Sequence, residues 1–249
     1  MDMIPNLCIT VTNRYDLLEK LFDSIDYPIK EICLLLNSNK DRDDDILNRL
    51  KCKFIQLKIF DPGYNFGLSS SWNSFIKKYV NIDGIVYITQ DDIEFKPNAL
   101  KDFYNITNSL IHDDVILGFS WGMFAIRKTS IEKLGYFDEN FYPIYYEDAD
   151  YCRRSHLHNM YKENKFKFGY GDRNQFIHFG GATSFKKSKV ELIEYQRMIG
   201  MNATYYIKKW GGSQGNETYN TPFNISELTY KDWIDNDDRH QNVCKSYNI

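Results

Sequence analysis

Apolar and polar residues follow two different periods along the first half of the chain. Short apolar runs predict strands over residues 7–11, 31–36, 54–60 and 84–89. Between these runs, apolar positions recur at helical spacing over residues 15–25 and 69–79, and Ser69 is placed to cap the second helix. The acidic stretch 41–45 is typical of a helix N-terminus. Strands that alternate with helices predict a mostly parallel sheet covered on both faces.

The pattern of the second half is less regular. It predicts two strands, over residues 115–119 and 123–126, and three helices, over residues 97–111, 147–158 and 186–210. The last helix is long, and Gly211-Gly212 is expected to end it. Beyond Pro222 the chain is polar and charged, as in a surface-wrapped or disordered tail.

Composition narrows the classes of function. The 249 residues suffice for one large domain. Because 31 basic and 34 acidic residues nearly balance, there is no electrostatic case for binding nucleic acid or an anionic membrane. Five cysteines without a CxxC pair argue for a reducing compartment and against structural zinc. No apolar run approaches the ~20 residues that span a bilayer, and the N-terminus lacks a signal-peptide pattern. A cytoplasmic protein, or one peripheral to a membrane, is expected.

An acidic run follows the predicted strand 84–89. It contains Asp91, Asp92 and Glu94, at the carboxyl end of a strand, where ligands of parallel sheets bind. Carboxylates there can hold a hard divalent cation, and such a cation commonly binds a diphosphate. Alternate residues of an extended chain share a face, so Asp92 and Glu94 are expected to point together and Asp91 away. A solvated acidic turn would have the same sequence, and the run alone leaves both interpretations open.

A second acidic cluster opens the predicted helix 147–158. On a helix, Glu147 and Asp150 share a face with Arg154, and Asp148 lies about 100° from Glu147. Dipole complementarity alone would also favour acidic residues at a helix start. The preceding segment 137–146 is rich in aromatic residues, however, and apolar surroundings raise the pKa of a carboxylate and make it a better general base.

His178 and three loops complete the candidates. His178 ends a short apolar strand before a Gly-Gly turn, and imidazole nitrogen with carboxylate oxygen suits Mn²⁺ better than Mg²⁺ or Ca²⁺. Residues 12–14, 37–39 and 61–67 follow strands and can hydrogen-bond a base or ribose, although ordinary strand-to-helix loops have the same composition. No GxGxxG, GxxxxGKS or GxSxG motif occurs, which argues against a dinucleotide cofactor, a P-loop and a serine nucleophile.

In order and spacing these segments resemble the GT-A fold glycosyltransferases, most closely glycosyltransferase family 2, over roughly residues 4–212. The resemblance rests on residues 11–14, 65–67, Asn73, 91–92, 118–127, 134–139, 147–153, His178 and 205–212. One departure concerns the DxD-like metal motif, which reads Gln90-Asp91-Asp92 and has Gln at its first acidic position. Whether Asp92 alone or Asp92 with Glu94 holds a cation therefore stays open.

The resemblance implies an α/β fold of the GT-A, Rossmann-like type, with a mostly parallel central sheet flanked by helices and a long C-terminal helix. It implies a domain over residues 1–222, divided into a nucleotide-binding half (1–95) and an acceptor-binding half (96–222), and a polar tail over residues 223–249. The implied reaction is an inverting hexosyl or deoxyhexosyl transfer. The donor would be a UDP-, GDP- or dTDP-linked sugar, and the acceptor a hydroxyl of a glycan or glycoconjugate.

The same resemblance implies roles for single residues. Asp92 and His178 would bind Mn²⁺ or Mg²⁺, and Asp148 would take the proton from the acceptor hydroxyl. Asp91 would face the ribose or sugar. The remaining roles are divided as follows: Thr12, Arg14, Asn37 and Asn65 frame the nucleotide, Glu147 and Arg153 position the catalytic helix on the acceptor side, and Trp121, Tyr145 and Tyr146 stack sugar rings.

Other functions stay open on the sequence. A nucleotidyltransferase can use a similar sheet and metal, but needs a basic, Gly-rich loop near the N-terminus that Asn13-Arg14 matches poorly. A catalytically inactive carbohydrate-binding homologue is favoured if Gln90 has removed the metal. A glycoside hydrolase uses two carboxylates but needs neither a metal nor a nucleotide-binding half.

Overall fold

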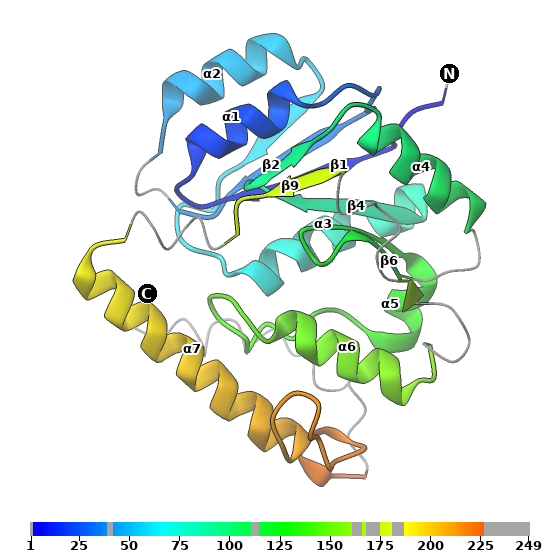
Figure 1. Cartoon of the computed structure of the whole chain (residues 1–249), viewed down its shortest axis with the longest axis vertical. Coiled ribbons are helices and arrows are strands. Elements are labelled where there is room, and N and C mark those ends of the chain that lie inside the picture. The colour runs from blue at the N-terminus through cyan, green and yellow to red at the C-terminus, as the bar shows by residue number, and fades with distance from the viewer. Residues whose placement is uncertain are drawn as a thin grey trace.

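Parallel strands form the first half of the central sheet (Figure 1). A computed structural model describes residues 2–38, 42–110, 115–160, 166–167, 175–180 and 187–226. In it, β1 (Leu7–Val11), β2 (Ile32–Leu36), β3 (Leu57–Phe60) and β4 (Ile85–Gln90) pair in the order β3-β2-β1-β4. The apolar runs predict these strands because β1 and β2 are buried at every position.

The sheet continues with strands from the second half of the chain. β7 (Met123–Arg127) pairs antiparallel with β4, β6 (Val115–Phe119) pairs antiparallel with β7, and β8 (Phe166–Lys167) pairs parallel with β6. Since β6 runs in the direction of β4, the carboxyl ends of both strands lie at the same edge of the sheet. The predicted fold class, a mostly parallel α/β sheet, is confirmed.

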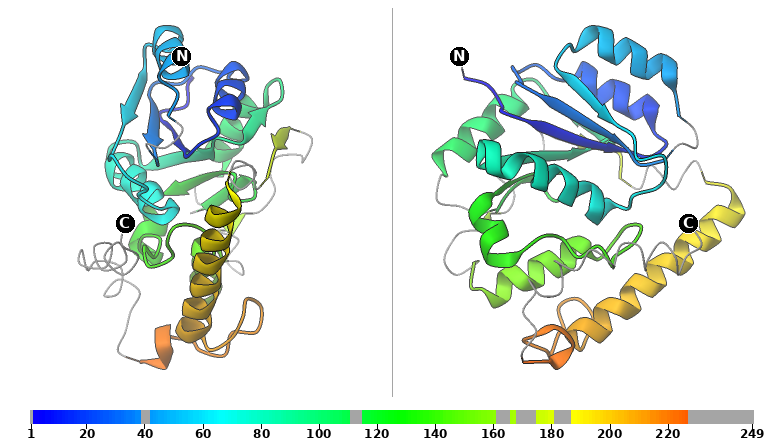
Figure 2. Two further views of the ribbon diagram at one scale, coloured as in Figure 1. Left: turned by 90° about the vertical axis from the view of Figure 1, so that its left-hand side faces the viewer. Right: turned by 180° about the vertical axis from the view of Figure 1, so that it is seen from behind.

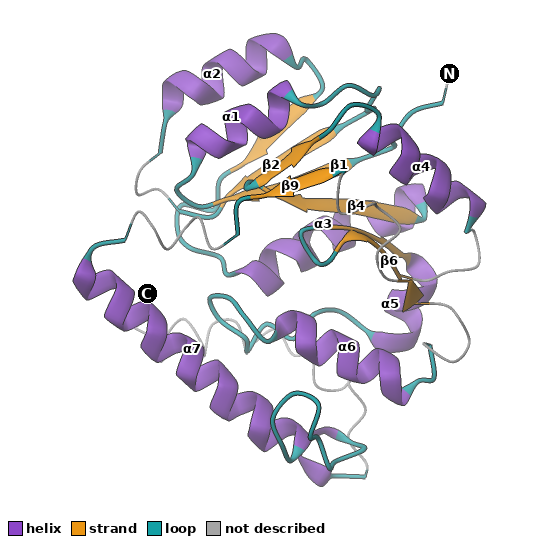
Figure 3. Ribbon diagram, viewed as in Figure 1, coloured by secondary structure: helices purple, strands orange, loops and turns teal. Residues whose placement is uncertain are grey.

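Helices cover both faces of this sheet (Figure 3). The core on one face includes side chains of α1 (Tyr15–Asp23), α2 (Asp44–Lys53) and α4 (Ala99–Ser109). The core on the other face includes side chains of α3 (Leu68–Asp83), α5 (Lys128–Leu134) and α6 (Glu147–Leu157). Ile9 and Cys8 of β1 point into these two cores respectively, as the alternation of a strand requires.

The helix α2 begins where the sequence predicts, whereas the predicted cap of α3 is wrong. Asp43 caps α2, since its carboxylate accepts the backbone N–H of Ile46 at 3.0 Å. The expected cap Ser69 is wrong, because α3 begins at Leu68 with Gly67 as its N-cap. Gly67 has φ 79°, and a Cβ there would lie 2.8 Å from the ring of Tyr142, so the chain turns where no side chain fits.

A two-stranded ribbon joins distant parts of the chain. β5 (Ile93–Phe95) follows β4 directly and pairs antiparallel with β9 (Phe176–His178). Ile93 lies opposite His178, and the N–H of Phe179 donates to the carbonyl oxygen of Asp92 at 3.0 Å. Backbone pairing thus holds His178 beside the residues that follow β4.

The long helix α7 (Lys189–Trp210) lies along the side of the molecule, apart from the central sheet (Figure 2). It begins with a capping box between Ser188 and Glu191 and ends at Gly211, whose φ is 73°. This confirms the predicted long helix and its stop. A short 3₁₀ helix, Pro222–Asn224, follows, and residues 227–249 of the predicted tail lie outside the described residues. Among the helices so described, none is long and apolar enough to cross a bilayer.

A buried ionic cluster attaches α7 to α6. Lys209 Nζ of α7 lies 2.7 Å from Asp138 Oδ2 and 2.6 Å from Asp150 Oδ1, and all three side chains are at most 1% exposed. Arg154 Nε donates to Asp150 Oδ2 at 2.9 Å, which confirms that these two residues share a helix face. Trp210 Nε1 also donates to Asp150. Burial alone would raise the pKa of Asp138, but the Lys209 charge and nearby donors lower this pKa to about 2.

Replacing Lys209 by Met is expected to destabilise the fold by roughly 3–5 kcal/mol, because it leaves the buried carboxylate of Asp138 without its cation and leaves Asp150 with Arg154 as its one remaining cation among the described residues. The free energy of unfolding can be measured by urea denaturation. The matched control is Lys208→Met, since Lys208 is exposed on the same turn of α7 and should change little.

This stabilisation should depend on pH in a defined direction. Because the pKa of Asp138 is lower in the folded chain than its usual value near 4, its contribution is complete above that value and is lost as the pH falls toward about 2. The difference in the free energy of unfolding between wild type and Lys209→Met should shrink over the same range. If Lys209→Met and Lys208→Met were equally stable at neutral pH, this result would contradict the role of the cluster.

Candidate active site

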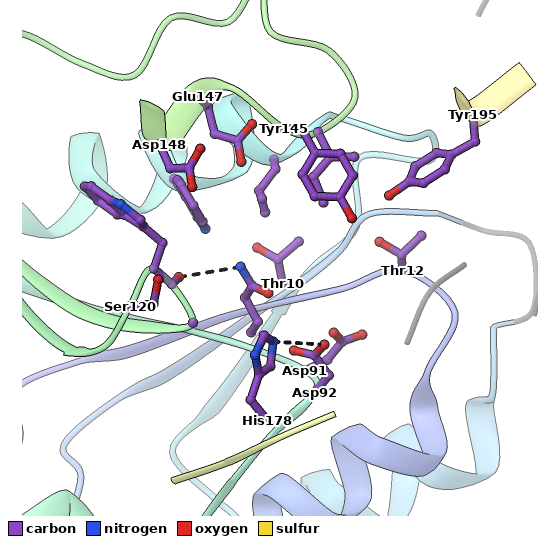
Figure 4. Close-up of a pocket in the computed structure, with 16 residues that line it drawn as sticks. Thr10, Thr12, Asp91, Asp92, Ser120, Tyr145, Glu147, Asp148, His178 and Tyr195 are labelled. Carbon is purple, nitrogen blue, oxygen red and sulfur yellow. Dashed lines mark hydrogen bonds and ion pairs between the residues drawn. The ribbon is translucent and has the colours of Figure 1, made fainter. Parts of the chain in front are cut away.

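A cavity of about 260 Å³ opens at the carboxyl edge of the central sheet (Figure 4). Its lining combines strand ends, the turn between β6 and β7, the start of α6 and one residue each from β9 and α7. The lining residues are Thr10, Thr12, Leu68, Trp72, Gln90, Asp91, Asp92, Ser120, Trp121, Gly122, Ile144, Tyr145, Glu147, Asp148, His178 and Tyr195.

One wall carries the acidic run. Asp91 and Asp92 form a turn directly after β4, both line the cavity, and each is 7% exposed. The expectation that Asp92 and Glu94 point together is wrong. The chain turns at residues 91–92 instead of staying extended, so Asp91 faces the cavity and Glu94, in β5, is not among its lining residues.

His178 belongs to the same wall. Its Nε2 lies 3.3 Å from Asp92 Oδ2, so the structure brings together the two residues that sequence resemblance singles out. The pairing of β5 with β9 fixes this proximity, because Ile93 and His178 are register partners. An imidazole nitrogen and a carboxylate oxygen thus converge in the cavity.

The electrostatics of this wall favour a cation. Burial and the charge of Asp92 raise the pKa of Asp91 to about 8, although the Thr12 N–H and the charge of Arg14 act in the opposite direction. Asp91 Oδ2 and Asp92 Oδ1 are buried and have no hydrogen-bond partner among the described residues. Such unpaired carboxylate oxygens fit a divalent metal that gains further ligands from a bound diphosphate. Within the same part of the chain, no group of three or more His, Cys, Asp or Glu residues is placed to hold a metal alone.

The opposite wall carries a second pair of carboxylates. Glu147 and Asp148 are the first two residues of α6 and lie across the cavity from Asp91, Asp92 and His178 (Figure 4). Burial raises the pKa of Asp148, while the N–H of Ala149, which donates to Asp148 Oδ1 at 2.7 Å, acts against this rise. Burial and the Asp148 charge raise the pKa of Glu147 well above its usual value. A carboxylate with a raised pKa suits a general base.

The backbone before α6 is strained. Tyr145 and Tyr146 have φ angles of 74° and 76°, in the left-handed region that non-glycine residues rarely adopt. Asn202 of α7 donates to the carbonyl oxygens of Ile144 at 3.0 Å and Tyr145 at 3.3 Å, and the N–H of Tyr145 donates to the Glu147 carboxylate. Contacts from α7 and α6 therefore hold this conformation.

Aromatic residues line the cavity in two different ways. Trp121 is 7% exposed and stacks on Trp72, with ring centres 6.1 Å apart, so most of its surface packs in the core. Tyr145 is 40% exposed and meets Tyr195 edge-on at 6.2 Å. Tyr146 packs on Tyr206 at 5.5 Å and does not line the cavity.

Several residues expected at the nucleotide or acceptor are not among the lining residues of the cavity. Asn37 Oδ1 accepts the N–H of Phe66 at 2.6 Å, and Asn65 Oδ1 accepts that of Gly67 at 2.9 Å, so both amides shape loops. Arg14 pairs with Asp16 at 2.8 Å. Arg153 donates to the carbonyl oxygen of Tyr219 at 2.8 Å, which directs it toward the segment after α7. Their roles toward a substrate stay predictions.

Other cavity residues were not named individually from the sequence, although two of them lie in the segment 118–127 on which the resemblance rests. Ser120 and Gly122 lie in the turn that follows β6, and the rule that ligands bind at carboxyl strand ends could have identified them, because β6 runs parallel to β4. Tyr195 had no comparable signal, since its position depends on the path of α7 across the molecule.

The chain is similar to a known protein family over most of its length. The model of the family described as Glycosyl transferase family 2 matches residues 7–190, well over half of the chain. Among curated proteins, no sequence matches the chain.

Solved structures with a similar fold are distant in sequence. The mannosyltransferase PcManGT from Pyrobaculum calidifontis, in complex with GDP-Man and Mn²⁺, has a TM-score of 0.52 and 13% identity over 85% of this chain and 79% of its own. S. aureus TarS 1-349 in complex with UDP has a TM-score of 0.55 and 14% identity over 86% and 74%, and this chain covers 45% of a longer TarS chain.

A third similar structure is glucosyl-3-phosphoglycerate synthase from Mycobacterium tuberculosis, in complex with Mn²⁺, UDP and glucosyl-3-phosphoglycerate. It has a TM-score of 0.52 and 11% identity over 80% of this chain and 78% of its own. The family match and the shared fold agree with the cavity at the sheet edge: the chain belongs to glycosyltransferase family 2 and is a glycosyltransferase of the GT-A fold.

Proposed function

We propose that this glycosyltransferase moves a hexosyl or deoxyhexosyl group, with inversion, from a UDP-, GDP- or dTDP-linked sugar to a hydroxyl of a glycan or glycoconjugate. The observation that carries the proposal is the arrangement of two acidic groups on opposite walls of one cavity (Figure 4). The group on one wall pairs Asp92 with the imidazole of His178, which suits a metal site for a diphosphate. The group on the other wall, at the start of α6, contains Asp148, which suits a base for an acceptor. The nucleotide-bound structures with the same fold support the choice of donor class.

The wall with Asp92 and His178 is the proposed place of the leaving group. These two residues would hold Mn²⁺ or Mg²⁺, which when bound would neutralise the charge of the departing diphosphate. Asp91, beside them, would face the ribose or sugar, and Thr12 would line the nucleotide. Because Gln90 does not supply a carboxylate, Asp91 and Asp92 are the acidic residues that this motif offers.

The wall with Asp148 is the proposed place of the acceptor. Asp148 would accept the proton of the acceptor hydroxyl. At the same time, the oxygen of that hydroxyl would form a bond to the anomeric carbon, and the bond between this carbon and the diphosphate oxygen would break. Attack from the wall opposite the leaving group inverts the anomeric centre. Glu147 would hold Tyr145 in place through the N–H that its carboxylate accepts.

The division into a nucleotide-binding half (1–95) and an acceptor-binding half (96–222) is part of this proposal. It is supported by the origin of the carboxylates: Asp91 and Asp92 come from the first half of the chain, and Glu147 and Asp148 come from the second. We also propose a cytoplasmic enzyme, or one peripheral to a membrane. Its support is that Cys8 and Cys33, register partners in neighbouring strands, are both free thiols.

Replacing Asp148 by Asn should leave nucleotide affinity unchanged and reduce kcat for sugar transfer about 10²–10⁴-fold, the loss typical of a missing general base. The substitution keeps the size of the side chain and removes its basicity. Transfer rates with a saturating donor, and nucleotide affinity by calorimetry, measure the two effects separately.

Asp45→Asn is the matched control, because Asp45 is likewise the second residue of its helix but is exposed and far from the cavity lining. Transfer by Asp148→Asn at the wild-type rate would rule out Asp148 as the base.

Replacing Asp92 by Ala should abolish the gain in nucleotide affinity that Mn²⁺ provides, and His178→Ala should weaken it. Calorimetric titration of UDP, GDP and dTDP with and without Mn²⁺ gives this gain directly. Glu94→Ala serves as control, since Glu94 lies two residues away but outside the cavity lining.

An unchanged metal-dependent gain in Asp92→Ala would place the cation elsewhere. The wild-type protein also separates the candidate functions when it is mixed with metal and, in separate reactions, with a panel of nucleotide sugars or with nucleoside triphosphates and a sugar phosphate. Release of free sugar and nucleoside diphosphate supports the glycosyltransferase, whereas release of diphosphate from a nucleoside triphosphate would support a nucleotidyltransferase, and neither reaction would support an inactive carbohydrate-binding homologue.

A further inference from the structure

We propose that Tyr195 of α7 joins Tyr145 in a subsite for a sugar ring at one end of the cavity, where Tyr195 adds a hydroxyl group to the stacking face that the resemblance already implies for Tyr145. This inference rests on the proposed function, because the ring would belong to the substrates of sugar transfer. It adds a second anchoring point, on α7, to a cavity whose carboxylates all lie on other elements.

The two side chains are arranged for contact with a ligand. Their ring centres lie 6.2 Å apart with planes at 61°, and both hydroxyl groups point toward the side of the cavity where Thr12 lies (Figure 4). Tyr145 is 40% exposed, whereas Tyr195 is 7% exposed and therefore acts as a fixed support. Lys187 contributes to this support, since its Nζ lies 4.9 Å from the centre of the Tyr195 ring.

The position of Tyr145 is maintained at a cost. A left-handed backbone is unfavourable for a non-glycine residue, and two successive tyrosines adopt it here. Asn202, itself buried, offsets part of this cost through its donation to the carbonyl of Tyr145. The ring of Tyr145 is thus held partly exposed at the cavity, and it contributes little to the packing of the core.

Tyrosine suits a sugar ring on chemical grounds. The flat ring packs against the C–H face of a sugar, and the hydroxyl can exchange hydrogen bonds with the hydroxyls of that sugar. A ribose of the nucleotide and a pyranose of the donor or acceptor share this chemistry. The subsite therefore takes a polyhydroxylated ring, and the experiment has one arm for each source.

Tyr195 lies beyond the residues that the family model matches, which end at residue 190. Among the residues that the structure describes, it is the one lining residue of the cavity that α7 contributes. We infer that α7 contributes to the choice of substrate.

The test compares wild type with Tyr145→Ala, Tyr195→Ala and Tyr195→Phe. The ribose arm is the affinity for UDP with Mn²⁺, measured by calorimetry. The pyranose arm is the binding of methyl glucoside, galactoside, mannoside and N-acetylglucosaminide, measured by saturation-transfer NMR with UDP and Mn²⁺ present. Each Ala variant should weaken binding in one arm by about 5-fold or more, the scale of a lost aromatic contact. Tyr195→Phe should retain the ring contact and fall between wild type and Tyr195→Ala.

Ile193→Ala is the matched control, because Ile193 lies on the same helix, is largely exposed and does not line the cavity. Losses of less than 2-fold in both arms for both Ala variants, or no binding of any probe to wild type, would overturn the subsite. Donor cleavage by wild type separates this result from the proposed function. If wild type releases sugar with metal but the Ala variants bind like wild type, the subsite fails and the function stands. If the probes depend on Tyr195 but no donor is cleaved, the subsite stands and the function fails.

Discussion

One buried ammonium group holds together the cavity wall that carries Glu147 and Asp148. Lys209 lies between Asp138, in the loop before α6, and Asp150, two residues after the proposed base Asp148. A charge removed from water is tolerated only where opposite charges and donors surround it, so this contact fixes α7, the loop and the first turn of α6 relative to one another. The place of Asp148 in the cavity therefore depends on a residue at the far end of the last long helix.

The opposite wall is assembled by a different physical means. There, a ladder of backbone hydrogen bonds between β5 and β9 brings His178 to Asp92, and no buried cation is required. A hydrogen-bonded ladder fixes register to within one residue, since a slip would turn His178 to the other face of the ribbon. The two walls thus have independent supports, and a change in one support need not displace the other.

The sequence predicted those parts of the molecule where burial is complete. The strands β1, β2 and β4 follow from uninterrupted apolar runs, and the Asp150–Arg154 pair follows from helical spacing. The strands β5 and β8, of three and two residues, were not predicted. The short helix α5 was not predicted, because seven residues carry too few periods to be recognised. Asp91 was assigned the wrong direction because a turn replaces the extended chain, and no local pattern indicates where a turn of two residues begins. Tyr195 reaches the cavity only through the tertiary path of α7, which sequence spacing does not encode.

The distribution of charge distinguishes the carboxylates that support the fold from those that face the cavity. Asp138 and Asp150 are buried, yet each contacts Lys209, and the pKa of Asp138 is lowered to about 2 despite its burial. Asp91, Glu147 and Asp148 are also largely buried, but burial raises the pKa of each. Lys209 therefore neutralises the two carboxylates that support the fold, and it is not among the residues that line the cavity. Acidic groups concentrated in this way reduce the stability of the unliganded protein. The same concentration lowers the free energy of any cation that enters, while burial by itself raises the pKa of Asp148, the proposed base. The cost of this acidic lining to stability and the proposed binding of a metal-bound diphosphate therefore have one physical origin.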